Sequence, residues 1–276
     1  MQNANDVCAQ QRGERRNAFH PVVAYRRLFA FCILHFAFCI AGLASTPPPD
    51  LVVLTWNLHA GAGDLTRLLA DLTEGRLTSD GPVSNFVLLL QEAGPDIREF
   101  AARRGLSAFY APVNPERGNA VVSTAPLYDN RTIDLPRVRQ RRVAVAATID
   151  VKGRRLRVVT THLENRVSWW RGGLFSEGAR LRQAEALVAA LPPGEPTVVG
   201  GDFNAWLGRS EPAWQALAAR FPDGPRPLTT PTFRQRLFLD EIFFDLPDGW
   251  RAQRLVVKER YGSDHHAVIG LLSPAS

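Results

Sequence analysis

Cysteine is scarce in this chain of 276 residues, which contains three. Cys8, Cys32 and Cys39 all precede Pro47. The rest of the chain therefore has no disulfide to form, and a metal site built there has no thiolate ligand. This absence excludes a cysteine-rich zinc site from residues 47–276 and turns attention to oxygen and imidazole ligands.

Lysine is almost as rare. Lys152 and Lys258 are the only lysines among 33 basic residues, so nearly all of the positive charge is arginine. The planar guanidinium suits bidentate contacts with phosphate. Codon bias produces the same excess of arginine, so this composition indicates a phosphate-bearing substrate only weakly.

A strong charge of one sign is also missing. The formal net charge is +6, and residues 1–44 supply half of it with five arginines against two acidic residues. The remainder of the chain is mildly basic. That balance is compatible with a phosphate-bearing substrate but does not require nucleic acid.

Long linkers, heptads and internal repeats are absent from Leu51 onward, where short apolar runs alternate with amphipathic stretches. No domain boundary presents itself. The composition is 45% hydrophobic, which is ample for a packed core. We therefore predict one α/β domain over residues 47–276.

The N-terminal residues have a different character. We predict a disordered extension over residues 1–25 and an export signal over residues 26–46. Two arginines precede an apolar run at residues 28–44, and small residues at Gly42 and Ala44 suit cleavage after Ala44. The paired arginines also resemble the start of a twin-arginine signal.

An uncleaved membrane anchor is the alternative for residues 26–46. The apolar run is about 17 residues long, which is the lower limit for crossing a bilayer as a helix. The protein is therefore expected to be exported to the periplasm or secreted, or else to contact the membrane through this segment.

Apolar runs of strand length lead repeatedly into polar side chains. Leu51–Trp56 ends in Asn57, Phe86–Leu90 leads to Glu92, and a hairpin over Val143–Thr161 ends at His162. Further strands are expected at residues 107–111, 119–123, 196–200, 237–244, 254–257 and 267–272. Helices are expected at residues 64–72, 95–104, 177–191 and 211–220, with Leu181, Ala184, Val188 and Leu191 on one face of the third.

Three clusters near the C-terminus follow the same pattern. Asp202 and Asn204 follow the strand at 196–200, Asp240 follows Leu237–Leu239, and Asp264 and His265 precede the last strand. Each cluster alone is more typical of a turn. Their recurrence beside strands indicates a reaction site, because strands hold such side chains in place and loops give access to them.

The residues of these clusters favour a hard metal ion. Carboxylate and amide oxygens without cysteine suit Mg²⁺, with Mn²⁺ or Ca²⁺ as alternatives, better than zinc. Mg²⁺ is usually held by one or two carboxylates, and Glu92 and Asp264 are available. His265 lies beside Asp264, with Asp240 on a preceding strand, and an imidazole oriented by a carboxylate serves acid-base chemistry.

Seven short motifs in this order resemble those of the endonuclease/exonuclease/phosphatase superfamily, over residues 51–272. They are Thr55-Trp56-Asn57, Leu90-Gln91-Glu92, Gly118–Ser123, Thr161-His162-Leu163, Gly201-Asp202-Phe203-Asn204, Leu239-Asp240-Glu241-Ile242 and Ser263-Asp264-His265. The resemblance implies a four-layered α-β-β-α sandwich with two mixed sheets packed face to face between helices. The short strands, hairpins and few crossover helices read from the sequence agree with that fold class.

The resemblance also implies roles for individual residues. Glu92 is expected to be the principal metal ligand, assisted by Asn57, with Asp264 near a metal position.

Five further residues are assigned to the reaction itself. Asp202 positions or deprotonates the attacking water, Asn204 and His162 bind phosphate oxygens, and His265 paired with Asp240 is an acid-base residue or stabilises the transition state. The choice of general base between Asp202 and His265 stays open.

The expected activity is hydrolysis of a phosphodiester by a monomeric, exported enzyme, with nucleic acid favoured as substrate. A phospholipid or sphingomyelin phosphodiesterase of the same superfamily is the alternative. A catalytically silent binding module is a third interpretation, but every catalytic position holds a competent residue. The chain also lacks the extra disulfides of the secreted deoxyribonuclease-I group, and His59 matches no role implied by the resemblance.

Two features bear on the substrate. Arg137, Arg139 and Arg141 alternate, so an extended chain would place them on one face, either to contact a phosphate backbone or to guard a solvated edge strand. The segment Trp169-Trp170-Arg171 follows His162, and its tryptophans are suited to stacking on a base, inserting into lipid or closing as a lid.

Overall fold

The structure is a computed structural model that describes residues 49–165, 176–222, 227–246 and 248–274. The predicted extension at 1–25, the predicted signal or anchor at 26–46 and the tryptophan pair at 169–170 lie outside these residues. In the described part of the chain, no helix has the length and apolar character needed to cross a bilayer.

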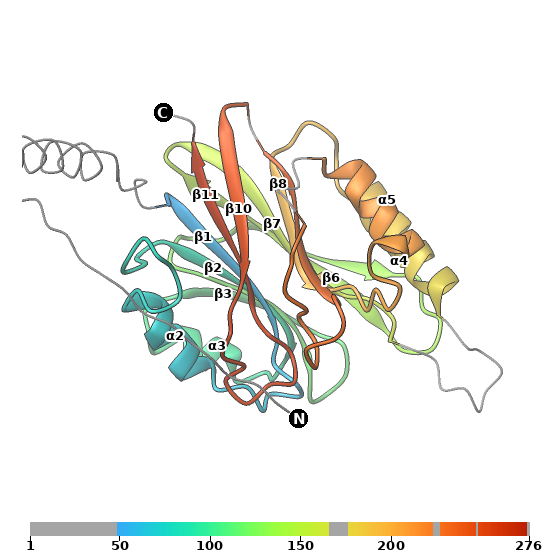
Figure 1. Ribbon diagram of the computed structural model, residues 1–276, viewed down its shortest axis with the longest axis horizontal. Coiled ribbons are helices and arrows are strands. Elements are labelled where there is room, and N and C mark those ends of the chain that lie inside the picture. The colour runs from blue at the N-terminus through green and yellow to red at the C-terminus, as the bar shows by residue number, and fades with distance from the viewer. Residues whose placement is uncertain (1–48, 166–175, 223–226, 247, 275–276) are drawn as a thin grey trace, which may run out of the picture. The chain divides into compact units, whose positions relative to one another are not determined.

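Two mixed sheets form the framework (Figure 1). The first has six strands in the order β10-β11-β1-β2-β4-β3. Their bounds are β1 Leu51–Asn57, β2 Phe86–Ala93, β3 Ser107–Pro112, β4 Gly118–Ser123, β10 Trp250–Val256 and β11 Val268–Pro274. Only β1 and β2 run parallel to each other, and the other neighbours are antiparallel.

The second sheet has five strands in the order β5-β6-β7-β8-β9. Their bounds are β5 Tyr128–Leu135, β6 Arg142–Val151, β7 Arg154–His162, β8 Thr197–Asp202 and β9 Asp240–Asp245. Again one central pair, β7 and β8, is parallel, and its neighbours are antiparallel. Each sheet is thus mixed, as predicted.

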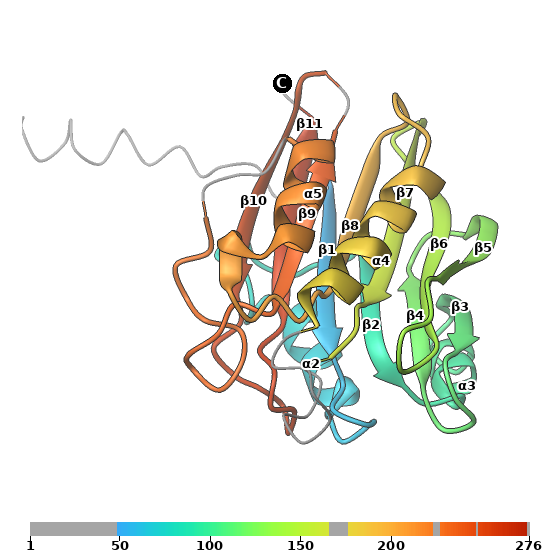
Figure 2. The same ribbon diagram turned by 90° about the vertical axis from the view of Figure 1, so that its right-hand side faces the viewer.

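Helices cover the outer face of each sheet (Figure 2). The helices α2 (Leu65–Thr73) and α3 (Ile97–Ala102) share an apolar cluster with the six-stranded sheet. The helices α4 (Glu177–Ala190) and α5 (Pro212–Arg220), with the short turn η2 (Gly208–Ser210) before α5, lie on the five-stranded sheet. A third cluster fills the space between the sheets. The predicted four-layered α-β-β-α sandwich is confirmed.

The parallel pairs explain where the polar residues meet. The ends of β1 and β2 carry Asn57 and Glu92, and the ends of β7 and β8 carry His162 and Asp202. Because β9 runs antiparallel to β8, its first residue, Asp240, lies opposite Asp202 in the ladder. Both sheets therefore place their polar side chains at the same edge of the sandwich.

The two sheets approach closely at Gly200. A Cβ atom built there would lie 2.7 Å from Leu89 Cδ1 and 3.0 Å from Thr55 Cβ, both on the opposite sheet. These separations are shorter than a carbon–carbon contact of about 3.5–4.0 Å. Only glycine fits between the sheets at this point, two residues before Asp202.

The structure corrects three details of the sequence interpretation. Residues 136–141 form a loop between β5 and β6, so Arg137, Arg139 and Arg141 do not lie on an edge strand; the edge strand is β5. The strand expected at residues 237–244 begins only at Asp240, as β9. The strand β5 was not predicted from the sequence, because most of its side chains are exposed and polar.

The helix α4 also differs from its prediction. Its buried side chains include Ala184 and Leu187 but also Arg180 and Gln183, whereas Leu181 is only partly buried. Apolar periodicity misplaced the face because these two polar residues point inward, where Arg180 forms a buried ion pair with Glu211.

Candidate active site

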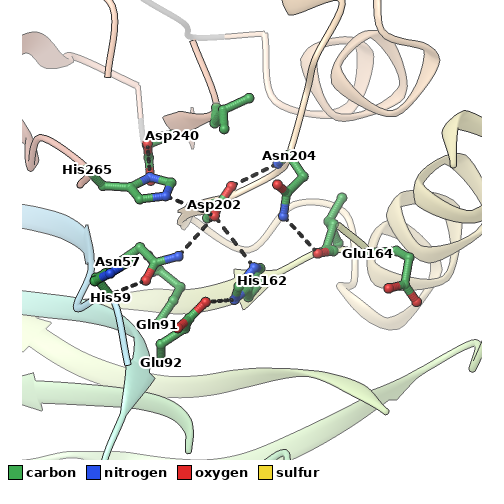
Figure 3. A network of polar contacts seen from close by, with 12 residues as sticks. Asn57, His59, Gln91, Glu92, His162, Glu164, Asp202, Asn204, Asp240 and His265 are labelled. Carbon is green, nitrogen blue, oxygen red and sulfur yellow. Dashed lines mark hydrogen bonds and ion pairs between the residues drawn. The ribbon is translucent and has the colours of Figure 1, made fainter. Parts of the chain in front are cut away.

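Asp202 is the centre of a buried polar network at the shared edge of the two sheets (Figure 3). Its Oδ2 accepts a hydrogen bond from Asn57 Nδ2 at 3.0 Å, and its Oδ1 accepts one from the Asn204 backbone amide at 2.9 Å. The Nε2 atoms of His162 and His265 lie 3.5 and 3.8 Å from the same Oδ2. Residues from both sheets thus converge on one carboxylate.

His265 is held by Asp240. The distance from His265 Nδ1 to Asp240 Oδ2 is 2.8 Å, and both side chains are buried. The ring of Phe233 packs on the imidazole with 4.7 Å between centroids. The hydroxyl of Thr232 accepts a hydrogen bond from the backbone amide of Asp240 at 3.0 Å, which fixes the start of β9. The imidazole therefore has one orientation, with Nε2 turned toward Asp202.

The pKa values of His265 and Asp202 are both raised, for different reasons. Burial lowers the pKa of His265, but the carboxylates of Asp240 and Asp202 outweigh it and raise that pKa to about 10. Burial, together with the nearby Asp240, raises the pKa of Asp202 to about 6, against the opposing effect of His265. At neutral pH the site therefore pairs an imidazolium with a carboxylate of elevated basicity.

His162 is the opposite case. Burial lowers its pKa well below 6.5, and the positive charges of Arg142 and His265 lower it further. The ring lies between two carboxylates, with Nδ1 3.9 Å from Glu92 Oε1 and Nε2 3.5 Å from Asp202 Oδ2. His162 is therefore a neutral imidazole at pH 7, which keeps one N–H donor and one acceptor.

Glu92 occupies an unusual backbone position. Its φ is +52°, and the pairing of β2 with β4 shifts register between Leu90 and Ala93, which marks a β-bulge. Non-glycine residues rarely adopt this conformation, and such strain is concentrated at functional sites. Below it, Gln91 points between the sheets and donates to Thr160 Oγ1 at 2.9 Å. The bulge leaves the Glu92 carboxylate facing the cavity.

The two oxygens of Glu92 have different surroundings. Oε2 accepts hydrogen bonds from the backbone amide of Ala60 at 2.9 Å and from Arg117 at 3.2 Å. Oε1 accepts no hydrogen bond from any residue that the structure describes, and the side chain is 25% exposed. One carboxylate oxygen is therefore open to a ligand.

Asn204 also has a positive φ, of +48°. Its Nδ2 donates to the Leu163 carbonyl at 3.1 Å. Because an amide nitrogen carries two hydrogens, a second donor is left for a bound anion. This geometry suits the predicted contact with a phosphate oxygen.

Asp264 lies at the edge of the polar network and contacts His59. The Nδ1 of His59 is 2.7 Å from Asp264 Oδ1, and the His59 backbone amide donates to Asn57 Oδ1 at 2.9 Å. Asp264 Oδ1 is also 3.9 Å from His265 Nε2. Nothing in the sequence pairs His59 with Asp264, because the two residues lie far apart along the chain.

An open cavity of about 830 Å³ lies over this network. Glu92, Asn204 and Asp264 line it from below. Its walls carry arginines and aromatic rings, namely Arg117, Trp206, Phe233, Arg234 and Arg236. The size falls within the range of about 300–1,000 Å³ that is typical of ligand pockets.

Two groups of residues at the site could hold a cation. Asp202, Asp240 and His265 offer ligand atoms within 4.8 Å of one another, and Asp240 Oδ1 is buried without a hydrogen-bond partner among the described residues. A protonated His265, however, has no lone pair for a metal. The open Oε1 of Glu92 and the nearby amide of Asn57 form the second group, and their oxygens suit Mg²⁺.

The sequence missed two charged residues of the site. Arg142 and Glu164 are 5% and 1% exposed, and the Arg142 guanidinium lies 4.0 Å from the Glu164 carboxylate. Arg142 stands in a run of exposed arginines and differs from them only in beginning β6. Its position before an apolar run was the signal that could have revealed its burial.

The paired His265 predicts a pH dependence of stability. A pKa raised to about 10 in the folded protein stabilises it fully below the ordinary value near 6.5, and this stabilisation is lost as the pH rises through 10. We expect the free energy of unfolding of His265→Gln to fall less steeply than that of the unchanged protein between pH 6.5 and 10. Urea unfolding in chelator measures both slopes, and parallel profiles would contradict the assignment.

Known proteins resemble this chain in sequence and in fold. The Escherichia coli (strain K12) protein YbhP is 31% identical over 179 residues, which are 56% of this chain and 66% of that protein. The match therefore spans just under two thirds of that relative. A protein of the same name in Shigella flexneri matches with the same identity and coverage.

Solved structures share the fold at lower identity. The human Nocturnin catalytic domain with bound sulfate has a TM-score of 0.61 and 22% identity, covering 83% of this chain and 94% of that one. An endonuclease/exonuclease/phosphatase from Beutenbergia cavernae has a TM-score of 0.59 and 20% identity, covering 82% and 72%. D. rerio TDP2 complexed with single-strand DNA product has a TM-score of 0.59 and 16% identity, covering 81% and 98%.

A sequence model of the Endonuclease/Exonuclease/phosphatase family matches residues 54–265. The matched range runs from β1 to His265 and includes every residue of the network around Asp202. The four covering helices and every strand except β11 lie within this range, apart from the first residues of β1. The chain therefore belongs to the endonuclease/exonuclease/phosphatase family.

Proposed function

We propose that this protein is a divalent-metal-dependent phosphodiesterase that acts on nucleic acid. The family consists of phosphoester hydrolases that use divalent metals. The observation that carries the proposal is the convergence on Asp202 of an amide from β1, a neutral imidazole from β7 and a charged imidazole ahead of β11. Such a set combines a base with donors for the charge that develops on phosphate.

Asp202 is the proposed general base. Its pKa of about 6 lies near neutral pH, where a base is most effective, and Asn57 and the Asn204 amide hold its carboxylate in place. His265 has a pKa of about 10, so it enters the reaction protonated and cannot take the proton of water. This difference supports Asp202 over His265 as the base.

The remaining residues would bind the phosphate. His265 places a positive charge, fixed by Asp240, beside the reacting group, and neutral His162 and Asn204 each supply an N–H donor. Donors arranged before the reaction stabilise the transition state without reorganising. A metal held by Glu92 and Asn57, with Asp264 nearby, would polarise a phosphoryl oxygen and lower the pKa of bound water.

The large cavity supports a nucleic acid as substrate. Arg234 and Arg236 stand on a tight turn at the cavity wall, where Arg234 and Gln235 both have positive φ. The rings of Trp206 and Phe233 lie in the same wall. Guanidinium groups suit phosphates, and aromatic rings suit stacking with bases. The finer choice between DNA and RNA rests with the assay.

The test is hydrolysis by the purified domain, with and without chelator. Plasmid DNA, single-stranded DNA, single-stranded RNA and bis(p-nitrophenyl) phosphate are the substrates, and phosphatidylcholine and sphingomyelin vesicles test the lipid alternative. We expect metal-dependent cleavage of at least one nucleic acid. Release of phosphocholine with intact nucleic acids would replace the proposal with the lipid phosphodiesterase.

Glu92→Gln is expected to weaken metal binding. The change keeps the size of the side chain but removes the charge of the open Oε1, and an amide is a poorer ligand for Mg²⁺ than a carboxylate. We expect the Mg²⁺ concentration for half-maximal activity to rise about tenfold or more and kcat to fall. The matched control is Glu116→Gln, an exposed residue of a nearby loop. Unchanged metal dependence in Glu92→Gln would remove Glu92 from the metal site.

Export or membrane anchoring belongs to the proposal as well, and it rests on the sequence of residues 26–46. Fractionation of cells that produce the full chain with a C-terminal tag distinguishes the cases. A shortened product outside the cytoplasm indicates cleavage after about Ala44, and a full-length product in the membrane fraction indicates an anchor. A full-length product in the cytoplasm would overturn both.

A further inference from the structure

A second cavity, of about 180 Å³, adjoins the large one and shares Glu92, Arg117 and Asn165 with it. Arg142, Gln140 and His162 line only the smaller cavity. Its volume lies below the range of about 300–1,000 Å³ that is typical of whole-ligand pockets. It therefore suits one small polar group of a larger molecule bound in the large cavity.

Arg142 is the unusual residue of this cavity. It is 5% exposed, yet its Nε has no partner among the residues that the structure describes. Its single recorded ionic contact in that part of the chain is with Glu164 Oε1, at 4.0 Å. A guanidinium has five N–H donors, and burying a charge without hydrogen bonds is costly. Arg142 is thus a buried cation whose donors are available.

Glu164 does not satisfy this cation. Its Oε2 already accepts the backbone amides of Arg139 and Gln140, at 3.2 and 3.4 Å. These bonds hold the loop that precedes β6, and they leave only Oε1 facing Arg142 at 4.0 Å. Glu164 therefore fixes the wall of the small cavity and leaves the guanidinium open to an anion.

We infer that the small cavity is a subsite for a second phosphate of the substrate, next to the phosphodiester that is hydrolysed. The inference rests on the proposed function. Asn204 and Asp264, which lie beside Asp202 and His265, line only the large cavity, whereas Arg142 lines only the small one. A charged guanidinium with free donors matches a phosphate in charge and geometry. The enzyme would therefore prefer substrates with a phosphate one nucleotide from the cleaved bond.

The second phosphate has two sources, which short substrates distinguish. A dinucleotide with one internal phosphodiester and free hydroxyl ends lacks it. The same dinucleotide with a 5′-phosphate or with a 3′-phosphate carries it as a terminal group, and a trinucleotide carries it as a second internal phosphodiester. We expect kcat/KM to rise about 10- to 100-fold with one of these additions, as charged hydrogen bonds predict.

Arg142→Gln tests the residue directly. We expect it to remove the gain from the second phosphate, so that kcat/KM becomes similar for the bare dinucleotide and for the substrates that carry the second phosphate. An equal loss on all substrates would assign Arg142 to the scissile phosphate and overturn the inference. Arg142→Lys keeps the charge but loses the planar fork, and an intermediate preference is expected.

A second variant guards against misfolding of the first. Gln140 is exposed and lines the small cavity, so Gln140→Glu adds a negative charge there without altering the core. We expect it to abolish the preference for the second phosphate. The matched control is Gln253→Glu on β10, which is exposed and lines neither cavity. A preserved preference in Gln140→Glu would count against the subsite.

A binding measurement separates failure of the subsite from failure of the proposed function. Calorimetric titration of the chelated protein with inorganic phosphate needs no turnover. We expect binding that Arg142→Gln and Gln140→Glu both weaken about tenfold or more, with Gln253→Glu unchanged. If no nucleic acid is cleaved but this pattern holds, the subsite stands and the proposed substrate is wrong. Phosphate binding that is absent, or unaffected by both variants, overturns the inference.

Discussion

His265→Ala is expected to lower kcat by about 10²- to 10⁴-fold, which is the usual contribution of a positioned acid-base or charge-stabilising group. The variant removes the imidazolium that Asp240 holds within 3.8 Å of Asp202 Oδ2. It also leaves the buried carboxylates of Asp240 and Asp202 facing each other without a cation. Steady-state kinetics on whichever phosphodiester the protein cleaves measures the effect.

The neighbouring histidine supplies the control for this prediction. His266 is buried as well, but its Nδ1 lies 2.8 Å from the Val257 carbonyl rather than from a carboxylate of the site. His266→Gln should cost stability while the folded protein keeps its turnover. If His265→Ala keeps kcat within about threefold, the charged imidazole has no part in the chemistry.

Arg180→Met is expected to lower the free energy of unfolding by about 3–5 kcal/mol, the cost of leaving one member of a buried ion pair alone. The Nε and Nη2 atoms of Arg180 lie 2.8 and 2.7 Å from Glu211 Oε1. Both side chains are fully buried. The pair joins α4 to the residue that precedes α5. Urea unfolding monitored by circular dichroism measures the loss.

Two further variants make this prediction specific. The double variant Arg180→Met, Glu211→Gln removes both charges and should recover part of the stability, since no uncompensated charge remains. Asp129→Asn breaks an ion pair on the surface, in which the side chains of Arg155 and Asp129 are 64% and 61% exposed. No measurable change in the free energy of unfolding is expected for this variant. A loss in Arg180→Met no larger than that in Asp129→Asn would show that the buried pair contributes nothing.

Much of the fold was predictable because buried strands in this chain have a clear pattern. Continuous apolar runs such as Leu51–Trp56 and Phe86–Leu90 are fully buried and lie side by side in a parallel pair. The hairpin of β6 and β7 was recognisable from its turn at Lys152 and Gly153, both of which have positive φ. Elements that bury little, such as β5, carry no such pattern.

The candidate site was predictable where a polar residue ends or begins a buried strand. Asn57, Glu92, His162 and Asp202 all lie at strand ends, and the structure brings them to one edge of the sandwich. Asp240 and His265 join them because β9 and β11 run in the opposite direction to β8 and β1. Strand direction, which a sequence shows only indirectly, decided which ends meet.

The rest of the site could not be predicted, because it depends on contacts between distant residues. Gln91 reaches Thr160 on the other sheet, 69 positions away, and nothing local marks it as a bridge. Arg142 and Glu164 resemble ordinary surface charges in the sequence, yet both are buried, and Glu164 accepts two backbone amides of the loop at 136–141. Burial of a charge is a tertiary property.

The close approach of the sheets at Gly200 makes the catalytic spacing a property of sheet stacking. Asn57 belongs to one sheet and Asp202 to the other, and the hydrogen bond of 3.0 Å between them spans the gap that Gly200 keeps narrow. A larger residue there would act as a wedge. The two sheets, and with them Asn57 and Asp202, would move apart, although no residue that touches the substrate had changed.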